Sequence, residues 1–348
     1  MAKTPILFLG ATGYIGGSVL SRLLSHPSRD DFDITALVRS PEKGEKLERF
    51  GVKAVIGSLK DIPLIEQLAQ NAHIVFSTAD SGDLDAITAL LAGLKKRHAT
   101  TNDIPTLIHT SGTGVLTAGD AATKGLGISE RIYRDDNPND IESISPTTVH
   151  RNVDIAIIQA DKEGYLRSYI IAPGAIWGIA KNQLVEAGVS NNYSKGFRLL
   201  VQASIARGQA GIVGKGQALW PCVNVEEQGD LFIILYDAII SSPGAVGHGR
   251  DGFYFGESGE YLWYDLAASI GKALVKRGTS KSDEPTPFTD EELAKYFGSK
   301  EFGEFFGTNS RAQAPHSRSL GWKPKLIAQD FLNNIDADVE LATKNQQA

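Results

Sequence analysis

Three glycines stand three residues apart near the start of the chain, in the stretch ILFLGATGYIGGSVLSRLL (6–24). An apolar run precedes Gly10 and a helical pattern follows Gly16, so the spacing predicts a turn between a strand and a helix. Glycine at these positions permits a tight turn, close approach of a pyrophosphate and close helix packing, and a helix N-terminus attracts phosphate. We therefore predict a dinucleotide-binding loop rather than a ligand-free packing turn. Its expected contacts are Gly10, Thr12, Gly13, Tyr14, Ile15 and Gly16.

The end of the second apolar run, in ALVRSPEK (36–43), bears on which dinucleotide is bound. Proteins that prefer NAD usually carry Asp or Glu there to bind the ribose hydroxyls. This chain has Arg39 at that position and Lys43 shortly after it, and a cation complements a 2′-phosphate. We therefore favour NADP. In the alternative, Arg39 stacks on the adenine, Lys43 is a solvated charge, and NAD is the cofactor.

Two later strand ends contribute further expected cofactor contacts. In GSLKD (57–61), Ser58 and Leu59 are placed to contact the adenine. Thr78 and Ala79 close the fourth apolar run and are expected beside the path of the cofactor.

These residues lie in a regular alternation of apolar runs and helical patterns through the first half of the chain. The predicted strands cover 5–10, 33–39, 52–58, 73–79 and 106–112. Parallel neighbours require crossover helices, so the alternation predicts an α/β fold with a Rossmann-type, doubly wound parallel sheet. A polar excursion over 114–145, a helix over about 148–163 and a sixth strand within 167–178 follow.

The second half of the chain is less regular and richer in aromatic residues. We predict an NAD(P)-binding Rossmann domain over 1–180 and a smaller C-terminal substrate lobe over 181–340, interleaved with the last sheet elements. Trp220, Tyr254 and Phe255 would suit an apolar substrate pocket, although aromatic residues are found more often in cores.

Composition narrows the classes of partner. The 348 residues carry a net charge of −6, which disfavours a nucleic-acid or anionic-membrane binder. The single cysteine, Cys222, cannot form an internal disulfide, and no His/Cys cluster has zinc-ligand spacing. We expect a cytoplasmic protein with a small-molecule substrate, and an oligomer is compatible with the sequence.

Five segments in order resemble the extended short-chain dehydrogenase/reductase superfamily: GATGYIGG, GSLKD, IHTSGTG, IIAPGAIWG and SLGWKP. The resemblance covers residues 5 to 335, and it is greatest to the atypical, epimerase/dehydratase-like and NmrA-like proteins common in fungi. It implies a backbone stretch over 172–178 along the nicotinamide, with Pro173 and Ala175 in contact with the cofactor. It also implies a Ser or Thr after the fifth strand, and a Tyr-x-x-x-Lys pair that exchanges a proton with the substrate.

The Tyr-x-x-x-Lys pair is absent from the helix where the superfamily has it. The lysine position falls on His150 and the tyrosine position on Pro146, within SISPTTVHRNVD. The chain does contain Tyr296 and Lys300 at the right spacing, but far from this helix, and we interpret that match as coincidence.

Other groups could replace the missing pair. Thr110, Ser111 and Thr113 follow the fifth strand and could orient a carbonyl. His150 titrates near neutral pH and could donate a proton or contact the ribose, although a capping or packing role is more common for such a residue. Tyr133 could swing over the nicotinamide from the preceding excursion. Two further residues of the same helix, Arg151 and Asp154, could form an ordinary surface ion pair.

The sequence thus favours an NADP-dependent oxidoreductase that reduces a small, apolar carbonyl compound or oxidises the corresponding alcohol. The absent pair favours a rival, a non-catalytic NADP(H) sensor of the NmrA-like kind. An NAD(P)-dependent epimerase or dehydratase on the same scaffold is the second rival.

Overall fold

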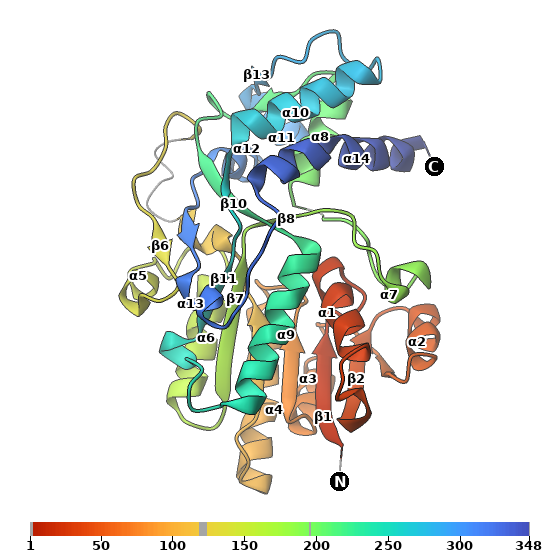
Figure 1. Ribbon diagram of the computed structural model, residues 1–348, viewed down its shortest axis with the longest axis vertical. Coiled ribbons are helices and arrows are strands. Elements are labelled where there is room, and N and C mark those ends of the chain that lie inside the picture. Colours follow the sequence, from red (N-terminus) through yellow and green to blue (C-terminus); the bar gives the residue numbers. More distant parts are fainter. Residues whose placement is uncertain (1–2, 118–123, 195, 348) are drawn as a thin grey trace.

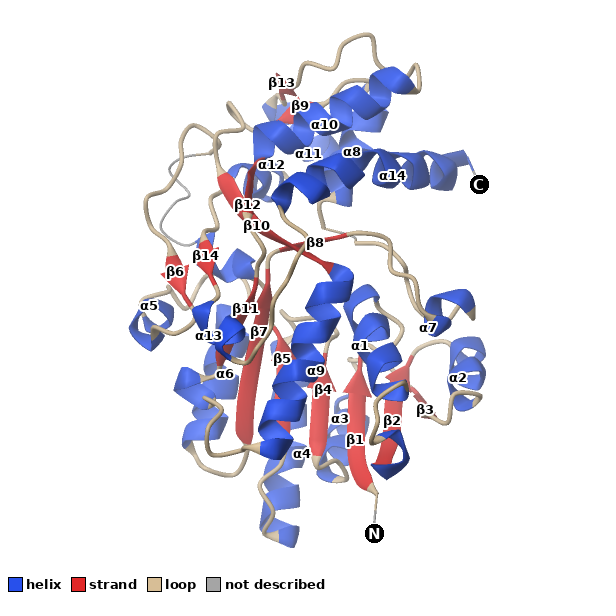
Figure 2. Cartoon of the chain, viewed as in Figure 1, coloured by secondary structure: helices blue, strands red, loops and turns tan. Residues whose placement is uncertain are grey.

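The computed structural model describes residues 3–117, 124–194 and 196–347, and its centre is a parallel sheet of seven strands (Figure 2). The strand order is β11-β7-β5-β4-β1-β2-β3. This order and the parallel pairing confirm the predicted Rossmann-type, doubly wound fold. The strands are β1 (Thr4–Leu9), β2 (Phe32–Val38), β3 (Lys53–Ile56), β4 (Ile74–Ser77), β5 (Thr106–Thr110), β7 (Arg167–Pro173) and β11 (Phe253–Gly256).

Helices cover both faces of the sheet, as a parallel sheet of nearly continuous apolar strands requires (Figure 1). Helices α1 and α9 lie on one face, whereas α3, α4 and α6 lie on the other (Figure 1). The helices of this part are α1 (Tyr14–Leu24), α2 (Pro41–Glu48), α3 (Ile62–Gln70), α4 (Leu84–Thr101), α5 (Pro138–Glu142), α6 (Arg151–Lys162), α7 (Gln183–Glu186), α9 (Val225–Ser241) and α13 (Pro315–Ser319).

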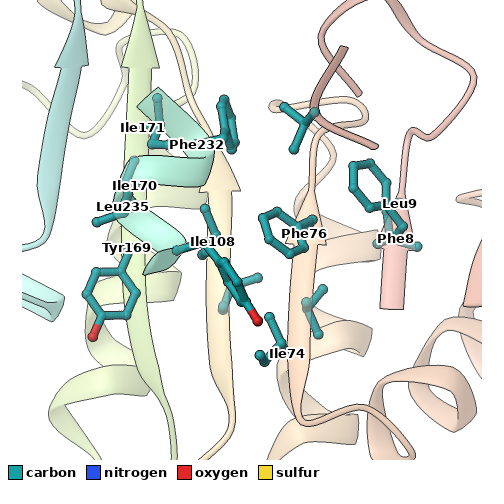
Figure 3. Close-up of a cluster of buried hydrophobic side chains, with 14 of the residues drawn as sticks. Phe8, Leu9, Ile74, Phe76, Ile108, Tyr169, Ile170, Ile171, Phe232 and Leu235 are labelled. Atoms are coloured by element: carbon teal, nitrogen blue, oxygen red, sulfur yellow. The ribbon is translucent and has the colours of Figure 1, made fainter. Parts of the chain in front are cut away.

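The core between α9 and the sheet holds the strand ends in place (Figure 3). Phe8 of β1 and Phe76 of β4 stack with their ring centroids 5.4 Å apart, and both side chains are completely buried. Phe232 and Leu235 of α9 are buried in the same cluster. Burial of each such side chain contributes about 1.5–3 kcal/mol to the stability of the fold. The carboxyl ends of these strands therefore form a rigid support for a binding site.

A second, largely helical lobe lies beyond the carboxyl ends of the strands (Figure 1). It has its own core, in which Trp263 and Phe331 are buried. Its helices are α8 (Arg198–Arg207), α10 (Trp263–Lys276), α11 (Asp290–Phe297), α12 (Lys300–Glu304) and α14 (Ala328–Gln347). The short strands are β6 (Tyr133–Arg134), β8 (Ala175–Trp177), β9 (Gly211–Ile212), β10 (Leu219–Asn224), β12 (Glu260–Leu262), β13 (Thr286–Pro287) and β14 (Ala312–Gln313). The 3₁₀ turns are η1 (Arg29–Asp31), η2 (Thr113–Thr117), η3 (Gly249–Asp251) and η4 (Phe305–Gly307).

The chain passes several times between the two cores. Helix α8 belongs to the lobe. The chain then returns to the core of the sheet with α9 and β11, and it enters the lobe again at β12. A division into domains at residue 180 therefore stays a prediction. Because β11 belongs to the sheet, Tyr254 and Phe255 are fully buried core residues there and do not line a substrate pocket.

Candidate functional site

A cavity of about 940 Å³ opens at the carboxyl ends of the parallel strands, between the sheet and the lobe. Residues at or just after the ends of β1, β2, β3, β4, β5 and β7 form its sheet side. β1 and β4 lie side by side at the point where the strand order reverses, and doubly wound sheets bind their ligands at that point. The cavity therefore occupies the position at which the glycine spacing predicts a dinucleotide.

The glycine loop closes the cavity beside β4. Gly10 has φ +91°, and a Cβ added there would lie 2.7 Å from the carbonyl carbon and oxygen of Thr78. Only glycine fits this conformation and this contact. Gly13 is the N-cap of α1 and donates its N–H to the carbonyl of Gly10 over 2.8 Å. A Cβ on Gly16 would collide with the carbonyl of Gly10, so its role is the predicted helix packing, and it does not line the cavity.

Two hydroxyls fix the loop from outside. The Tyr14 hydroxyl donates to the carbonyl of Gly178 over 2.6 Å, and the Thr78 hydroxyl donates to the carbonyl of Leu9 over 2.8 Å. Burial raises the pKa of Tyr14 well above its usual value, so this phenol stays protonated. Four further predicted contacts, Thr12, Tyr14, Ile15 and Ala79, line the cavity along with Gly10, Gly13 and Thr78.

The other predicted cofactor contacts lie at or after the ends of β2 and β3, and not all of them line the cavity. Arg39 lines the cavity and is exposed, and no carboxylate of the described chain lies within ion-pair distance of it. Ser58 and Leu59 line the same end. Lys43 does not: it lies in α2, where its backbone N–H donates to the Ser40 side chain. Of the two cations predicted to meet a 2′-phosphate, the structure brings one to the cavity.

The opposite end of the cavity collects several of the candidate catalytic residues. Ser111, Thr113 and His150 line it, together with Pro173 and Ala175. The backbone over 173–175 thus runs along this end, as the resemblance implies for the nicotinamide.

Two candidates for the chemistry lie elsewhere. Thr110 is the last residue of β5, where its buried hydroxyl has no partner within the described chain and does not line the cavity. Tyr133 is buried in β6, which pairs with β14, and the Arg131 guanidinium lies 4.5 Å from its ring centroid. The strand pairing holds this tyrosine away from the cavity, which it does not line.

The chance Tyr-x-x-x-Lys match also lies away from the cavity. Tyr296 is in α11, and the Lys300 ammonium pairs with Asp290 over 2.6 Å. Neither residue lines the cavity.

His150 is the N-cap of α6 and adopts a left-handed conformation with φ +68°. Its Nδ1 lies 3.0 Å from the Ser81 hydroxyl. Burial lowers the pKa of His150 below its usual value, and the negative charge of Asp80 opposes that shift in part. The imidazole is therefore neutral at pH 7 and can act as a hydrogen-bonding group beside Gly112, where it adjoins the backbone.

A buried carboxyl backs the same end of the cavity, and sequence reasoning did not predict this role for it. The Ser111 hydroxyl donates to Oδ2 of Asp154 over 3.1 Å, and Asp154 has no exposed surface. Burial raises the pKa of Asp154 to about 7, against the opposing effects of Ser111 and Arg151. This group can therefore gain and lose a proton at neutral pH.

The expectation of a surface ion pair between Arg151 and Asp154 is wrong. Both side chains are buried, with exposed fractions of 4% and 0%, and no ion pair joins them. The inward face of α6 carries Asp154 to the end of β5, because this helix packs over the sheet. One sequence signal was available: Asp154 stands four residues after His150, so both fall on one face of the helix.

The lobe side of the cavity is aromatic. Its ring-bearing residues include Trp220 and Trp263, whose indole N–H groups both donate to the carbonyl of Thr308, over 2.7 and 3.1 Å. Trp220 also packs edge-on against Phe305, with ring centroids 5.2 Å apart. The polar atoms of these indoles are thus satisfied within the lobe. The aromatic lining residues are Tyr193, Phe197, Trp220, Tyr261, Trp263, Phe302, Phe305 and Phe306.

We call this lobe side of the cavity the aromatic wall, and charged and hydrogen-bonding groups are scarce on it. Among the described residues, the charged lining groups Arg39, Lys60, Asp80 and Asp83 all lie on the sheet side, and Lys60 pairs with Asp83 over 2.8 Å. The Tyr261 hydroxyl is buried without a partner in the described chain, and burial raises its pKa well above the usual value. It is a protonated donor within a wall of aromatic rings.

Comparison with known proteins agrees with this arrangement. Residues 2–96 match the model of the NmrA-like family. The oxidase ucsJ of an Acremonium species is 28% identical over 333 residues, covering 92% of each chain. The family resemblance inferred from the sequence is confirmed.

Solved structures share the fold of this chain over nearly its full length. The UDP-glucose 4-epimerase of Thermotoga maritima, with UDP-glucose bound, has a TM-score of 0.63 at 15% identity and covers 99% of this chain and 100% of its own. The dTDP-glucose 4,6-dehydratase of Bacillus anthracis, in complex with NAD, has a TM-score of 0.63 at 15% identity, with 99% and 98% covered. The chain therefore has the fold of the NAD(P)-binding epimerases and dehydratases.

Other features exclude further kinds of site from the described chain. No group of three or more metal-ligating side chains occurs among the residues that the structure describes. Within that same part of the chain, no helix is long and apolar enough to cross a membrane. Cys222 is buried, and burial raises the pKa of its thiol to about 12, which leaves it unreactive at neutral pH.

Proposed function

We propose that this protein is an NADP-dependent oxidoreductase that reduces an apolar carbonyl compound or oxidises the corresponding alcohol. The observation that carries the proposal is one continuous cavity, with a glycine cradle at one end and an uncharged aromatic wall at the other. Such a cavity can hold a dinucleotide and an apolar substrate against each other.

The cofactor fits the chain's own residues. Gly10 lets the loop pack against Thr78, and Gly13, the N-cap of α1, lines the cavity without a side chain, so a pyrophosphate can approach the N-terminus of α1. Arg39 is an unpaired cation at the end of β2, where an acidic residue would repel a 2′-phosphate. When bound there in reduced form, this cofactor supplies a hydride. The preference for NADP over NAD rests on Arg39 alone, because Lys43 lies outside the cavity.

The proton is proposed to come from Ser111 and Asp154. As the carbonyl oxygen gains the electron pair of its C–O π bond, the Ser111 hydroxyl gives it a proton. When Asp154 is protonated, its carboxylic acid donates to Ser111 Oγ, which frees the serine hydroxyl for the substrate, and the acid then replaces the proton that Ser111 gives up. Thr113 and the neutral His150 hold the substrate oxygen or the ribose. In the direction of alcohol oxidation, the carboxylate form of Asp154 receives the proton.

The aromatic wall separates this proposal from the epimerase and dehydratase alternative. A nucleotide-sugar substrate carries a diphosphate, and buried phosphates need cations or donors that pair with them. The described lobe residues of the wall carry no charge. The non-catalytic NADP(H) sensor remains the rival, because the segment that leads into α6 lacks the Tyr-x-x-x-Lys pair that the superfamily has there.

The deciding experiment offers purified protein and NADPH to a panel of uncharged aromatic ketones, with UDP-glucose and dTDP-glucose in parallel. We expect NADPH oxidation with at least one ketone and no conversion of either nucleotide sugar. Tight NADPH binding without oxidation across the ketones would support the sensor instead. Conversion of a nucleotide sugar would contradict the reading of the aromatic wall.

A further inference from the structure

A second cavity, of about 510 Å³, lies between α5, α6 and the η3 turn, and we call it the α6 cavity. It shares no lining residue with the cofactor cavity. Its apolar surface comes mainly from isoleucines, and Ile155 at its edge has an exposed fraction of 39%. The residues that line it are Pro138, Ile141, Glu142, Arg151, Ile155, Ile158, Gln159, Asp161, Lys162, His248 and Arg250.

The carboxylates of the α6 cavity are already occupied. Glu142 accepts two hydrogen bonds from Arg250, at 2.7 and 2.9 Å. Asp161 accepts hydrogen bonds from the backbone N–H and the hydroxyl of Ser168, and it also pairs with His248 over 2.9 Å. Neither carboxylate is therefore available to neutralise a further cation.

Arg151 is a buried charged group of the α6 cavity without a partner. Its exposed fraction is 4%, and its Nε and Nη1 have no hydrogen-bond partner in the described chain. Burial lowers its pKa, with Asp154 and Glu142 opposing the shift. A guanidinium stays charged in proteins, and a buried charge without hydrogen bonds is costly. Lys162, on the rim, also has no ion pair among the described residues.

We propose that the α6 cavity binds a small organic anion, namely a carboxylate on an apolar chain. The carboxylate pairs with Arg151, which offers the planar, two-pronged donor geometry that carboxylates match. The apolar chain lies on Ile141, Ile155 and Ile158. A ligand of this kind satisfies both features that the protein leaves open, the unpaired buried cation and the apolar lining.

An anion bound at Arg151 also affects the proposed proton source, Asp154, and this part of the inference rests on the proposed function. The positive charge of Arg151 lowers the pKa of Asp154, which hydrogen-bonds Ser111. An anion bound at Arg151 offsets that charge, so Asp154 keeps its proton to higher pH. Among the other charges packed around α6, Glu163 pairs with Lys95 of α4 and Asp161 pairs with His248, whereas Lys162 is exposed at the rim. His109, at the end of β5, is neutral because burial lowers its pKa to about 3.

Isothermal titration with octanoate at pH 7 tests the site without reference to catalysis. We expect saturable binding to the full-length protein and no such binding of 1-octanol. Arg151→Gln should weaken octanoate binding at least tenfold. Ile155→Glu, which adds a negative charge at the exposed rim without touching the buried arginine, should do the same. Arg49→Gln removes an exposed arginine far from the cavity in sequence and serves as the matched control.

The outcomes separate the alternatives. Equal octanoate affinity in the wild type, Arg151→Gln and Ile155→Glu overturns the site, since binding then occurs elsewhere. Loss of octanoate binding in Trp220→Ala overturns it too, because the carboxylate would then occupy the cofactor cavity. A dimer that Ile155→Glu dissociates, with no octanoate binding to the wild type, assigns the cavity to a second copy and overturns the proposal. Retained binding with an unchanged pH profile of reduction overturns only the coupling to Asp154.

Discussion

The substitution Asp154→Asn tests the proton source directly, because asparagine keeps a hydrogen-bonding amide beside Ser111 but cannot supply a proton. With the pKa of Asp154 at about 7, the protonated fraction in the wild type falls from about one half at pH 7 to about one hundredth at pH 9. We expect the rate of carbonyl reduction per enzyme to fall about 50-fold over that range. In Asp154→Asn the rate should be lower, on the order of 100-fold at pH 6, and independent of pH above 7.

The same carboxyl makes a prediction about stability that needs no substrate. A carboxyl whose pKa is raised on folding binds more protons in the folded than in the unfolded state between pH 4 and 7. Its stabilising contribution is present below about pH 4 and is lost as the pH rises to 7. For a shift from about 4 to about 7, the free energy of unfolding should fall by about 2.5 kcal/mol between pH 5 and 8 on account of this group.

Urea unfolding at pH 5 and pH 8 measures this loss. Asp154→Asn should unfold with a smaller pH-dependent loss than the wild type, by about 2.5 kcal/mol. Asp85→Asn, at an exposed aspartate of α4, is the matched control and should follow the wild type. Asp154 does not carry the raised pKa if Asp154→Asn shows the same loss of stability as the wild type, and it is not the proton source if the variant's activity keeps the wild-type decline above pH 7.

Three further substitutions test the cofactor and substrate ends of the cavity. Arg39→Asp should weaken NADPH binding by about 10- to 100-fold, the range of a charge-assisted hydrogen bond, and should shift preference toward NADH in fluorescence titrations, whereas Lys43→Gln should bind both as the wild type does. Gly10→Ala should abolish dinucleotide binding and destabilise the fold by about 1–3 kcal/mol in thermal unfolding, because its φ is +91° and its Cβ would meet Thr78. Trp220→Ala should raise the KM for aromatic ketones while leaving NADPH affinity unchanged, since the indole lies on the lobe wall; a loss of NADPH binding would place the cofactor differently.

The sheet could be predicted from the sequence because its signals are local. The apolar runs that end at residues 10, 39, 58 and 79 all became neighbouring strand ends, and a parallel sheet brings such ends to one edge. For that reason most predicted cofactor contacts line the cavity. Lys43 does not, because a position five residues past the end of β2 already lies in α2.

The lobe and the proton source could not be predicted, because they depend on contacts between distant segments. The hydrogen bond from Ser111 to Asp154 joins residues 43 apart. The aromatic wall combines residues from about 193 to 306, and the lobe core forms only after the chain has crossed between the two cores. An aromatic residue at one position carries no signal of this, so Tyr254 and Phe255 were as plausible as Trp220 from the sequence.

Burial explains how an Asp could replace the absent tyrosine. A tyrosine needs a neighbouring cation to lower its pKa from about 10 toward neutral pH, which is the role that the superfamily gives to lysine. The pKa of a carboxyl starts at about 4 and must instead be raised toward neutral pH, and desolvation alone raises it. Asp154 is fully buried, and its pKa stands at about 7 although Ser111 and Arg151 both act to lower it. A lysine in place of His150, one helical turn away, would favour the carboxylate further and remove the proton. The absence of lysine from this helix face is thus a condition for Asp154 to serve as the acid.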